Sequence, residues 1–214
     1  MDAKNIDYEL KPFTITLAGV FALEFFAMTA TGADPLLVTG IVRTLQAVFI
    51  SAVAFRFKNS ARIAGLGPGL ADLAGGIKKG LVWSLIFGTL AAIVAVCIAI
   101  AGFDPVEMIG VGLPSDTKML IVFLLVAALI GPFAEELLFR GVIYGFLRKY
   151  GALAAVFGSS ALFVLAHSFE GIALTHVIGA IVFAVVYEYE KNIMVPVTIH
   201  ALGNLAMFST GFLS

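Results

Sequence analysis

The feature that most constrains this chain is its series of long apolar runs. Hydrophobic residues make up 61% of the 214 residues, whereas charged residues make up 13%. A soluble domain of this length cannot bury so much apolar surface, because much of its surface must face water. The composition therefore excludes an ordinary soluble globular protein and a disordered chain, and it predicts a membrane protein.

Seven runs are candidates for membrane-spanning helices, which need about 20 mostly apolar residues each. They cover residues 12–33, 36–55, 80–103, 119–147, 152–167, 172–189 and 193–212. We therefore expect an all-α fold, a polytopic bundle of about seven transmembrane helices that forms one integral membrane domain over residues 1–214. The first run is not a signal peptide, because it is long and carries Glu24. The segment 56–79 contains too many glycines for one continuous helix.

The basic residues between these runs fall almost entirely on one side of the predicted membrane. Ten lie on one side and only Lys118 lies on the other: Lys4, Lys11, Arg56, Lys58, Arg62, Lys78, Lys79, Arg148, Lys149 and Lys191. Positive charge marks the cytoplasmic side, so we expect a cytoplasmic N-terminus and an external C-terminus. The short loops favour a prokaryotic cell membrane. The net charge of -1 excludes a nucleic-acid-binding surface.

Two charged residues lie in the first two runs, on either side of a tight turn at Asp34. Glu24 precedes this turn by ten residues and Arg43 follows it by nine. With a rise of about 1.5 Å per residue, the two side chains lie at nearly the same depth in an antiparallel helical hairpin. The pattern predicts an ion pair inside the membrane, with a structural role or as a wall of an active cavity.

The fourth run contains the segment GPFAEELLFR, residues 131–140. Pro132 lacks a backbone N–H, so we expect a kink or break just before the acidic residues. Glu136 and Arg140 are four residues apart and can pair on one face of a helix. Glu135 is rotated by about 100° from Glu136, so it can point into a different space.

Further polar residues follow at helical spacing in the later runs. Phe163 and His167 share one helix face, as do His200 and Asn204. Counted from the cytoplasmic ends, Glu135, His167, His200 and Asn204 lie within about 10 Å of one another along the membrane normal. This agreement predicts one polar site near the middle of the membrane. His176 is interpreted as a packing or interfacial residue.

This set of side chains suits the hydrolysis of an amide. A carboxylate can act as a general base on water, and a nearby histidine can orient that water. A second histidine and an asparagine can donate hydrogen bonds to an oxyanion. As an alternative, Glu135, His167 and His200 are ligand types that bind zinc, although no His-Glu-x-x-His spacing is present.

Three segments in this order resemble a known family. Glu135-Glu136-x-x-x-Arg140, Phe163-x-x-x-His167 and His200-x-x-x-Asn204 resemble the motifs of the CAAX prenyl protease and bacteriocin-processing family, also called the CPBP or ABI family. The resemblance covers residues 119–212, which we interpret as the catalytic helices.

The resemblance implies an intramembrane endopeptidase, and we favour a metal-free enzyme because Asn204 is better used as a donor to the oxyanion. In that reading Glu135 activates water together with His167, and His200 and Asn204 form the oxyanion hole. Glu136, Arg140 and Phe163 support the site. The implied partners are the lipid bilayer and a peptide substrate, either prenylated or a bacterial peptide undergoing maturation. The alternatives are a zinc-dependent form of the same protease, a proton-coupled transporter, and a bacteriocin immunity protein.

Overall fold

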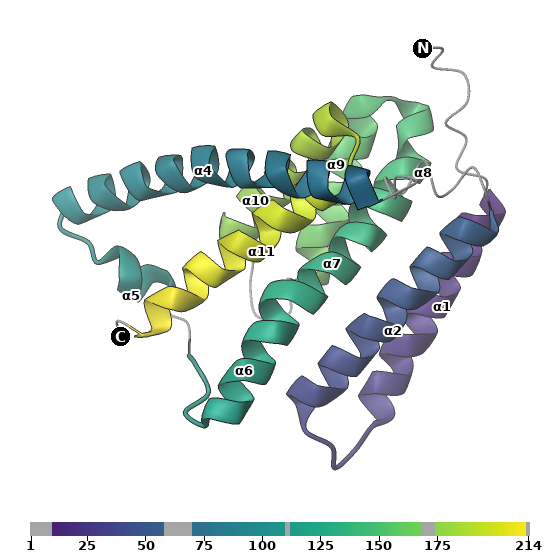
Figure 1. The fold of residues 1–214 in the computed structure, drawn as a ribbon, viewed down its shortest axis with the longest axis horizontal. Coiled ribbons are helices and arrows are strands. Elements are labelled where there is room, and N and C mark those ends of the chain that lie inside the picture. The colour runs from purple at the N-terminus through teal and green to yellow at the C-terminus, as the bar shows by residue number, and fades with distance from the viewer. Residues whose placement is uncertain (1–9, 58–69, 110–111, 168–173, 213–214) are drawn as a thin grey trace.

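A computed structural model describes residues 10–57, 70–109, 112–167 and 174–212, and within these ranges every regular element is a helix. Figure 1 shows their arrangement. The helices are α1 (Leu10–Thr29), α2 (Pro35–Arg56), α4 (Leu70–Ile100), α5 (Pro105–Ile109), α6 (Thr117–Leu125), α7 (Gly131–Glu136), α8 (Gly145–Leu147), α9 (Ala152–Ala166), α10 (Leu174–Glu190) and α11 (Met194–Ser209). Two π-helical segments, η2 (Val126–Ile130) and η3 (Leu137–Tyr144), join α6, α7 and α8 into one long helix, and a 3-10 turn, η6 (Thr210–Phe212), follows α11.

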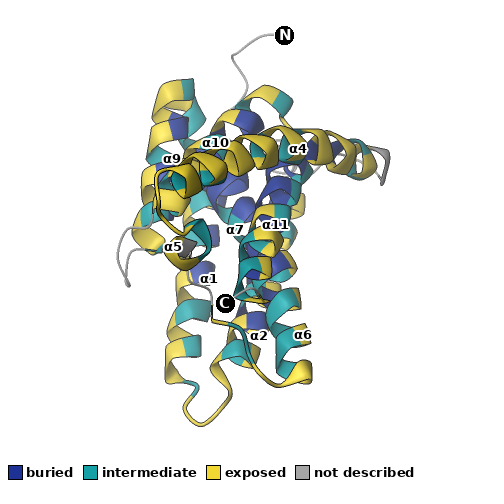
Figure 2. Ribbon diagram, turned by 90° about the vertical axis from the view of Figure 1, so that its left-hand side faces the viewer, coloured by how far each residue is buried: buried dark blue, intermediate teal, exposed yellow. Residues whose placement is uncertain are grey.

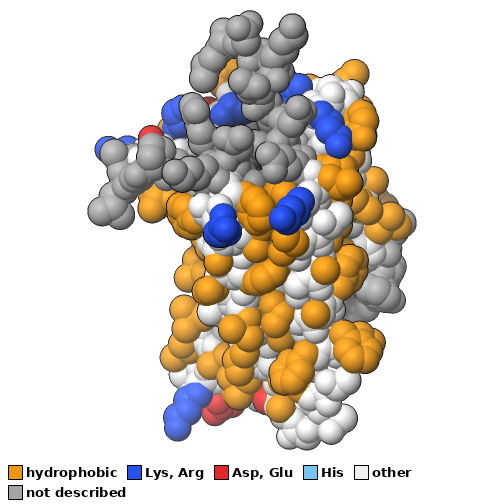
Figure 3. Space-filling model, turned by 90° about the vertical axis from the view of Figure 1, so that its right-hand side faces the viewer, with side chains coloured by type: hydrophobic (Ala, Val, Ile, Leu, Met, Phe, Trp, Pro, Cys, Tyr) orange, Lys and Arg blue, Asp and Glu red, His pale blue; other side chains and the backbone are white. Residues whose placement is uncertain are grey.

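The outer surface of this bundle is apolar, as a lipid environment requires. Among the residues that the structure describes, four segments are long and apolar enough to cross a membrane: Leu10–Thr29, Pro35–Arg56, Asp72–Ile100 and Thr117–Tyr150. Large side chains such as Phe21, Phe25 and Phe26 are exposed on α1, and Figure 3 shows a broad apolar band over one face. Buried residues gather in the interior, around α7, α10 and α11 (Figure 2). The protein is therefore a multi-pass integral membrane protein, and the predicted all-α bundle is confirmed.

The first predicted run extends too far at its C-terminal end. Helix α1 ends at Thr29, and the chain then turns through Gly32, whose φ of 84° is unfavourable for other residues. Asp34 ends this turn as the N-cap of α2, because its Oδ1 accepts hydrogen bonds from the backbone N–H groups of Leu36 and Leu37 at 2.9 and 3.1 Å. Residues 30–33 therefore form a turn rather than a helix.

The third predicted run, residues 80–103, begins ten residues after the start of the helix that contains most of it. Helix α4 begins at Leu70 and runs without interruption to Ile100, whereas residues 58–69 lie outside the described residues. Gly76 and Gly80 leave no room for a larger side chain, because they face Asn192 and Thr198. These glycines allow α4 to pack closely on α11, and this tertiary contact outweighs their low helix propensity.

The long helix from α6 to α8 occupies the centre of the bundle and positions the polar site. Helix α2 packs against α7 on one side, whereas α11 packs against it on another. Helices α9 and α10 contact the following segment η3. At the predicted cytoplasmic end, Arg148 binds Glu188 with two hydrogen bonds of 2.9 and 3.1 Å, which join α10 to the end of the central helix.

The orientation of this bundle can be tested by cysteine labelling. A cysteine introduced at Ser214 of a Cys97→Ser variant is expected to react with a membrane-impermeant maleimide added from outside intact cells, because the basic residues place the C-terminus outside. The background substitution is needed because the native Cys97 is exposed. A cysteine introduced at Lys149 should react only after the cells are opened. The reverse labelling pattern would contradict the predicted orientation.

Candidate functional site

The helix that carries the acidic residues is irregular just before them. In η2, the N–H of Gly131 donates to the carbonyl of Val126, a spacing of five residues. At the same spacing, the carbonyl of Ala127 would need the N–H of residue 132, which is a proline and has none. Asn204 satisfies this carbonyl instead, because its Nδ2 donates a hydrogen bond of 2.8 Å to the oxygen of Ala127. The predicted irregularity before Glu135 is confirmed, as a π-helical segment rather than a break.

Glu136 and Arg140 form the predicted pair, and both side chains are fully buried. Arg140 Nη1 lies 3.1 Å from Glu136 Oε1, and Arg140 Nη2 donates to the carbonyl of Ala180 at 2.9 Å. The guanidinium also lies over the ring of Phe163, 4.8 Å from its centroid. Glu136 Oε1 accepts a further hydrogen bond of 2.9 Å from His200 Nδ1. The pair therefore fixes the position of His200 on the neighbouring helix α11.

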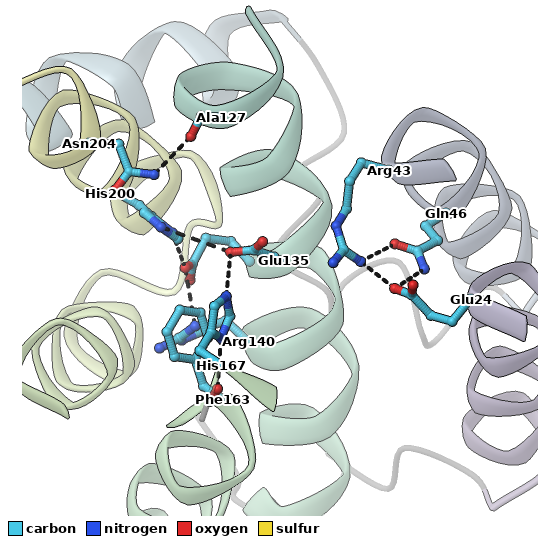
Figure 4. Close-up of polar contacts among 11 residues, drawn as sticks. Glu24, Arg43, Gln46, Ala127, Glu135, Arg140, Phe163, His167, His200 and Asn204 are labelled. Carbon is cyan, nitrogen blue, oxygen red and sulfur yellow. Dashed lines mark hydrogen bonds and ion pairs between the residues drawn. The ribbon is translucent and has the colours of Figure 1, made fainter. Parts of the chain in front are cut away.

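Glu135 points away from Arg140 and toward two histidines, as its rotation on the helix predicts (Figure 4). Its Oε2 lies 3.8 Å from His167 Nε2 and 3.9 Å from His200 Nε2. The carboxylate retains 15% exposure, so it is less enclosed than that of Glu136. Three helical segments of the chain thus bring one carboxylate and two imidazoles together.

His167 follows the last residue of α9, and three contacts fix its ring. Its Nδ1 lies 2.8 Å from the carbonyl oxygen of Phe163, and its ring stacks on that of Phe163 with a centroid distance of 4.4 Å. The ring of His176 stacks near it as well, at 5.1 Å. Because a carbonyl oxygen only accepts, Nδ1 must carry the proton, and Nε2 of the neutral ring is then an acceptor aimed at Glu135. His176 therefore packs, as predicted, but it packs directly on a site residue.

His200 is held in a similar way. Its ring stacks on Phe183, with a centroid distance of 4.8 Å, and meets Phe163 edge-on at 5.9 Å. Since its Nδ1 faces the carboxylate of Glu136, its Nε2 is the atom that faces Glu135. Asn204 lies one turn further along α11, beside η2. All seven residues predicted for the site are therefore placed around Glu135 or in contact with its neighbours.

The ion pair predicted between α1 and α2 is also present, with a third residue that the sequence analysis did not single out. Arg43 Nη1 lies 2.5 Å from Glu24 Oε1 and donates to Gln46 Oε1 at 2.7 Å. Gln46 Nε2 donates to the same Glu24 oxygen at 2.9 Å. The three-residue spacing between Arg43 and Gln46 was the available signal for this contact.

The separations within the site are wider than those between the ligands of a bound zinc ion. Zinc binds nitrogen and oxygen ligands at about 2.0–2.2 Å, so neighbouring ligand atoms of a tetrahedral site lie roughly 3.3–3.5 Å apart. Glu135 Oε2 is 3.8 and 3.9 Å from the two histidine nitrogens. In the part of the chain that the structure describes, no group of three His, Cys, Asp or Glu side chains is arranged to hold a metal ion.

The fold and the site together define a polytopic helical membrane protein with a carboxylate and two imidazoles inside the bundle. Residues 117–206 match the family described as Type II CAAX prenyl endopeptidase Rce1-like. This stretch contains all seven predicted site residues.

Two curated bacterial proteins are similar to this chain. The membrane-embedded CAAX protease MroQ of Staphylococcus aureus (strain USA300) is 33% identical over 105 residues, which cover 42% of this chain and 42% of MroQ. The putative membrane peptidase YdiL of Bacillus subtilis (strain 168) is 29% identical over 114 residues, which cover 49% of this chain and 47% of YdiL. The matches thus span less than half of each relative. No solved structure matches the chain.

Proposed function

We propose that this protein is an intramembrane endopeptidase in which Glu135 activates a water molecule for attack on a peptide bond. The observation that carries the proposal is the convergence of His167 Nε2 and His200 Nε2 on Glu135 Oε2, at 3.8 and 3.9 Å. These separations exceed a direct hydrogen bond but allow one water about 2.8 Å from each atom. The match to the Rce1-like family supports the same activity.

In the proposed mechanism, the water donates one hydrogen to Glu135 and the other to His167 Nε2. This assignment follows from the contact of His167 Nδ1 with the Phe163 carbonyl, which leaves Nε2 as an acceptor. The water oxygen then directs a lone pair toward the carbonyl carbon of the substrate. When the C–O bond forms, Glu135 takes the proton, which it later gives to the departing amine.

His200 and Asn204 are the proposed donors to the oxyanion. His200 Nδ1 donates to Glu136, so Nε2 can donate as well only when the ring holds both protons. In the proposal, the His200 ring therefore holds both protons when the oxyanion forms. Asn204 uses one N–H for the Ala127 carbonyl, and its second N–H remains for the oxyanion.

The proposed substrate is a peptide that reaches the site within the lipid bilayer, either a prenylated CAAX-type peptide or a bacterial peptide undergoing maturation. MroQ is named as a CAAX protease and YdiL as a putative membrane peptidase, which supports a peptide substrate. The proposed enzyme uses no metal, and the zinc-dependent form is the alternative.

The direct test is cleavage by the purified protein in lipid nanodiscs. Matched libraries of prenylated and unprenylated peptides are incubated with the wild-type protein and with a Glu135→Gln variant, and the products are identified by mass spectrometry. We expect new peptide termini with the wild-type protein only. If the wild-type protein yields no product from either library, or if the variant yields the same products, the proposed function is wrong.

A further inference from the structure

The polar cluster of Glu24, Arg43 and Gln46 lies in a hairpin that is otherwise apolar. An arginine inside the membrane is costly and usually serves a site. The hydrogen bonds among these three residues link α1 to α2. An ion pair that only links α1 to α2 could lie at any height in the hairpin. The position of Arg43 relative to the other helices therefore indicates whether it has a further role.

The guanidinium of Arg43 lies on the side of α2 that is turned toward α7 and Glu135 (Figure 4). Helix α2 packs directly on α7, and Arg43 interacts electrostatically with both Glu135 and His167. The histidines approach Glu135 from α9 and α11. Arg43 therefore faces the site from α2, a helix that carries none of the proposed hydrolytic groups.

The hydrogen bonds of Arg43 to its two neighbours use only one nitrogen of the guanidinium. Among the described residues, its side-chain hydrogen bonds to Glu24 and Gln46 both leave from Nη1. A guanidinium has five N–H donors, and two parallel ones match the two oxygens of a carboxylate. The side chain also retains 27% exposure, whereas that of Arg140 is fully enclosed. Arg43 is thus oriented by its neighbours and keeps donors for a further partner.

We propose that Arg43 binds a carboxylate of the peptide substrate and so determines which peptides are cleaved. This proposal rests on the proposed peptidase function, because it places a recognition group beside the hydrolytic one. The shared chemistry is a carboxylate, which a peptide supplies either as its free C-terminus or as an acidic side chain. Glu24 and Gln46 act as positioning residues for the guanidinium.

Three peptides of otherwise identical sequence test the proposal: one with a free C-terminal carboxylate, one with a C-terminal amide, and one with the amide and a glutamate near the cleaved bond. The wild-type protein is expected to cleave a carboxylate-bearing peptide with kcat/KM about 10- to 100-fold above that of the plain amide, the range for hydrogen bonds to a charged group. The first and third peptides distinguish the C-terminus from a side chain.

Arg43→Gln is expected to abolish this preference, mainly through a higher KM for the carboxylate peptide, so that the kcat/KM values of the carboxylate and amide peptides become nearly equal. The matched control is Arg148→Gln, since Arg148 also pairs with a glutamate and is 30% exposed, but lies at the other end of the central helix. This control should keep the preference. If Arg43→Gln lowers cleavage of both peptides equally, Arg43 acts through Glu135 and the proposal is overturned.

Two further measurements keep the proposal testable if a variant misfolds or if no peptide is cleaved. Arg43→Lys retains the charge but not the paired donors, so it should fold and keep only part of the preference. Equilibrium binding of the labelled carboxylate and amide peptides to Glu135→Gln requires no turnover. The carboxylate peptide should bind more tightly than the amide, and adding Arg43→Lys to Glu135→Gln should weaken this binding. That result would support the Arg43 site even if the protein cleaves no peptide. Equal binding of the two peptides would overturn the proposal.

Discussion

Glu135→Gln is expected to abolish peptide cleavage while leaving the protein folded. The glutamine keeps the size of the side chain and its hydrogen-bonding oxygen, but it cannot take a proton from water. The loss of a general base typically lowers turnover about 10²- to 10⁴-fold. The side chain is partly exposed and makes no ion pair with Arg140 in the described structure, so the free energy of unfolding should change little. The measurements are kcat on a cleaved peptide and the thermal unfolding temperature.

Glu136→Gln is the matched control, because the two residues are adjacent in the same helix but differ in surroundings. Glu136 is fully buried and contacts both Arg140 and His200. Removing its charge leaves a buried guanidinium without its partner, which typically costs about 3–5 kcal/mol. This variant should therefore lose stability as well as activity. Near-normal turnover in Glu135→Gln, or equal destabilisation by both variants, would show that the roles of the two acids are wrongly assigned.

Most of the contacts that the sequence predicts lie within one helix; the Glu24–Arg43 pair is the exception, because the tight turn at Asp34 sets the depth of both residues. Glu136 and Arg140, and likewise Phe163 and His167, lie four residues apart, so helical geometry alone brings them together. The agreement in depth also brought Glu135, His167 and His200 to one level, because the rise per residue of a helix is nearly constant. Depth alone does not say which helices are neighbours in the plane of the membrane. The structure shows that the helical segments with these three residues are neighbours.

The features that could not be predicted from the sequence depend on contacts between helices. Nothing in the sequence around Gln46 indicates its hydrogen bond to Glu24, which forms only because α1 packs beside α2. Helix α4 extends over a glycine-rich segment because α11 offers a surface on which only glycines fit. Asn204 of α11 bonds the Ala127 carbonyl because Pro132 has no N–H to donate to that carbonyl. In each case the deciding partner lies far away in the sequence.

Asn204 gives the last prediction, because it separates the metal-free enzyme from the zinc alternative. In the metal-free mechanism Asn204 donates to the oxyanion, and the loss of one such donor typically lowers turnover about 10²- to 10³-fold. With zinc at Glu135, His167 and His200, the ion would stabilise the oxyanion, and Asn204→Ala should be milder. We expect a severe defect in kcat for Asn204→Ala with little change in KM, and wild-type activity that resists strong chelators.

The structure requires one control for this experiment, because Asn204→Ala also leaves the Ala127 carbonyl without its partner. The double variant Pro132→Ala, Asn204→Ala restores a backbone N–H at position 132, which can bond that carbonyl at the five-residue spacing of the π-helical segment. If the defect of Asn204→Ala comes from the lost oxyanion donor, the double variant stays inactive. Recovery of activity in the double variant would assign Asn204 a structural role. Zinc bound at about one ion per chain, and lost together with activity in His167→Ala, would establish the metal-dependent mechanism instead.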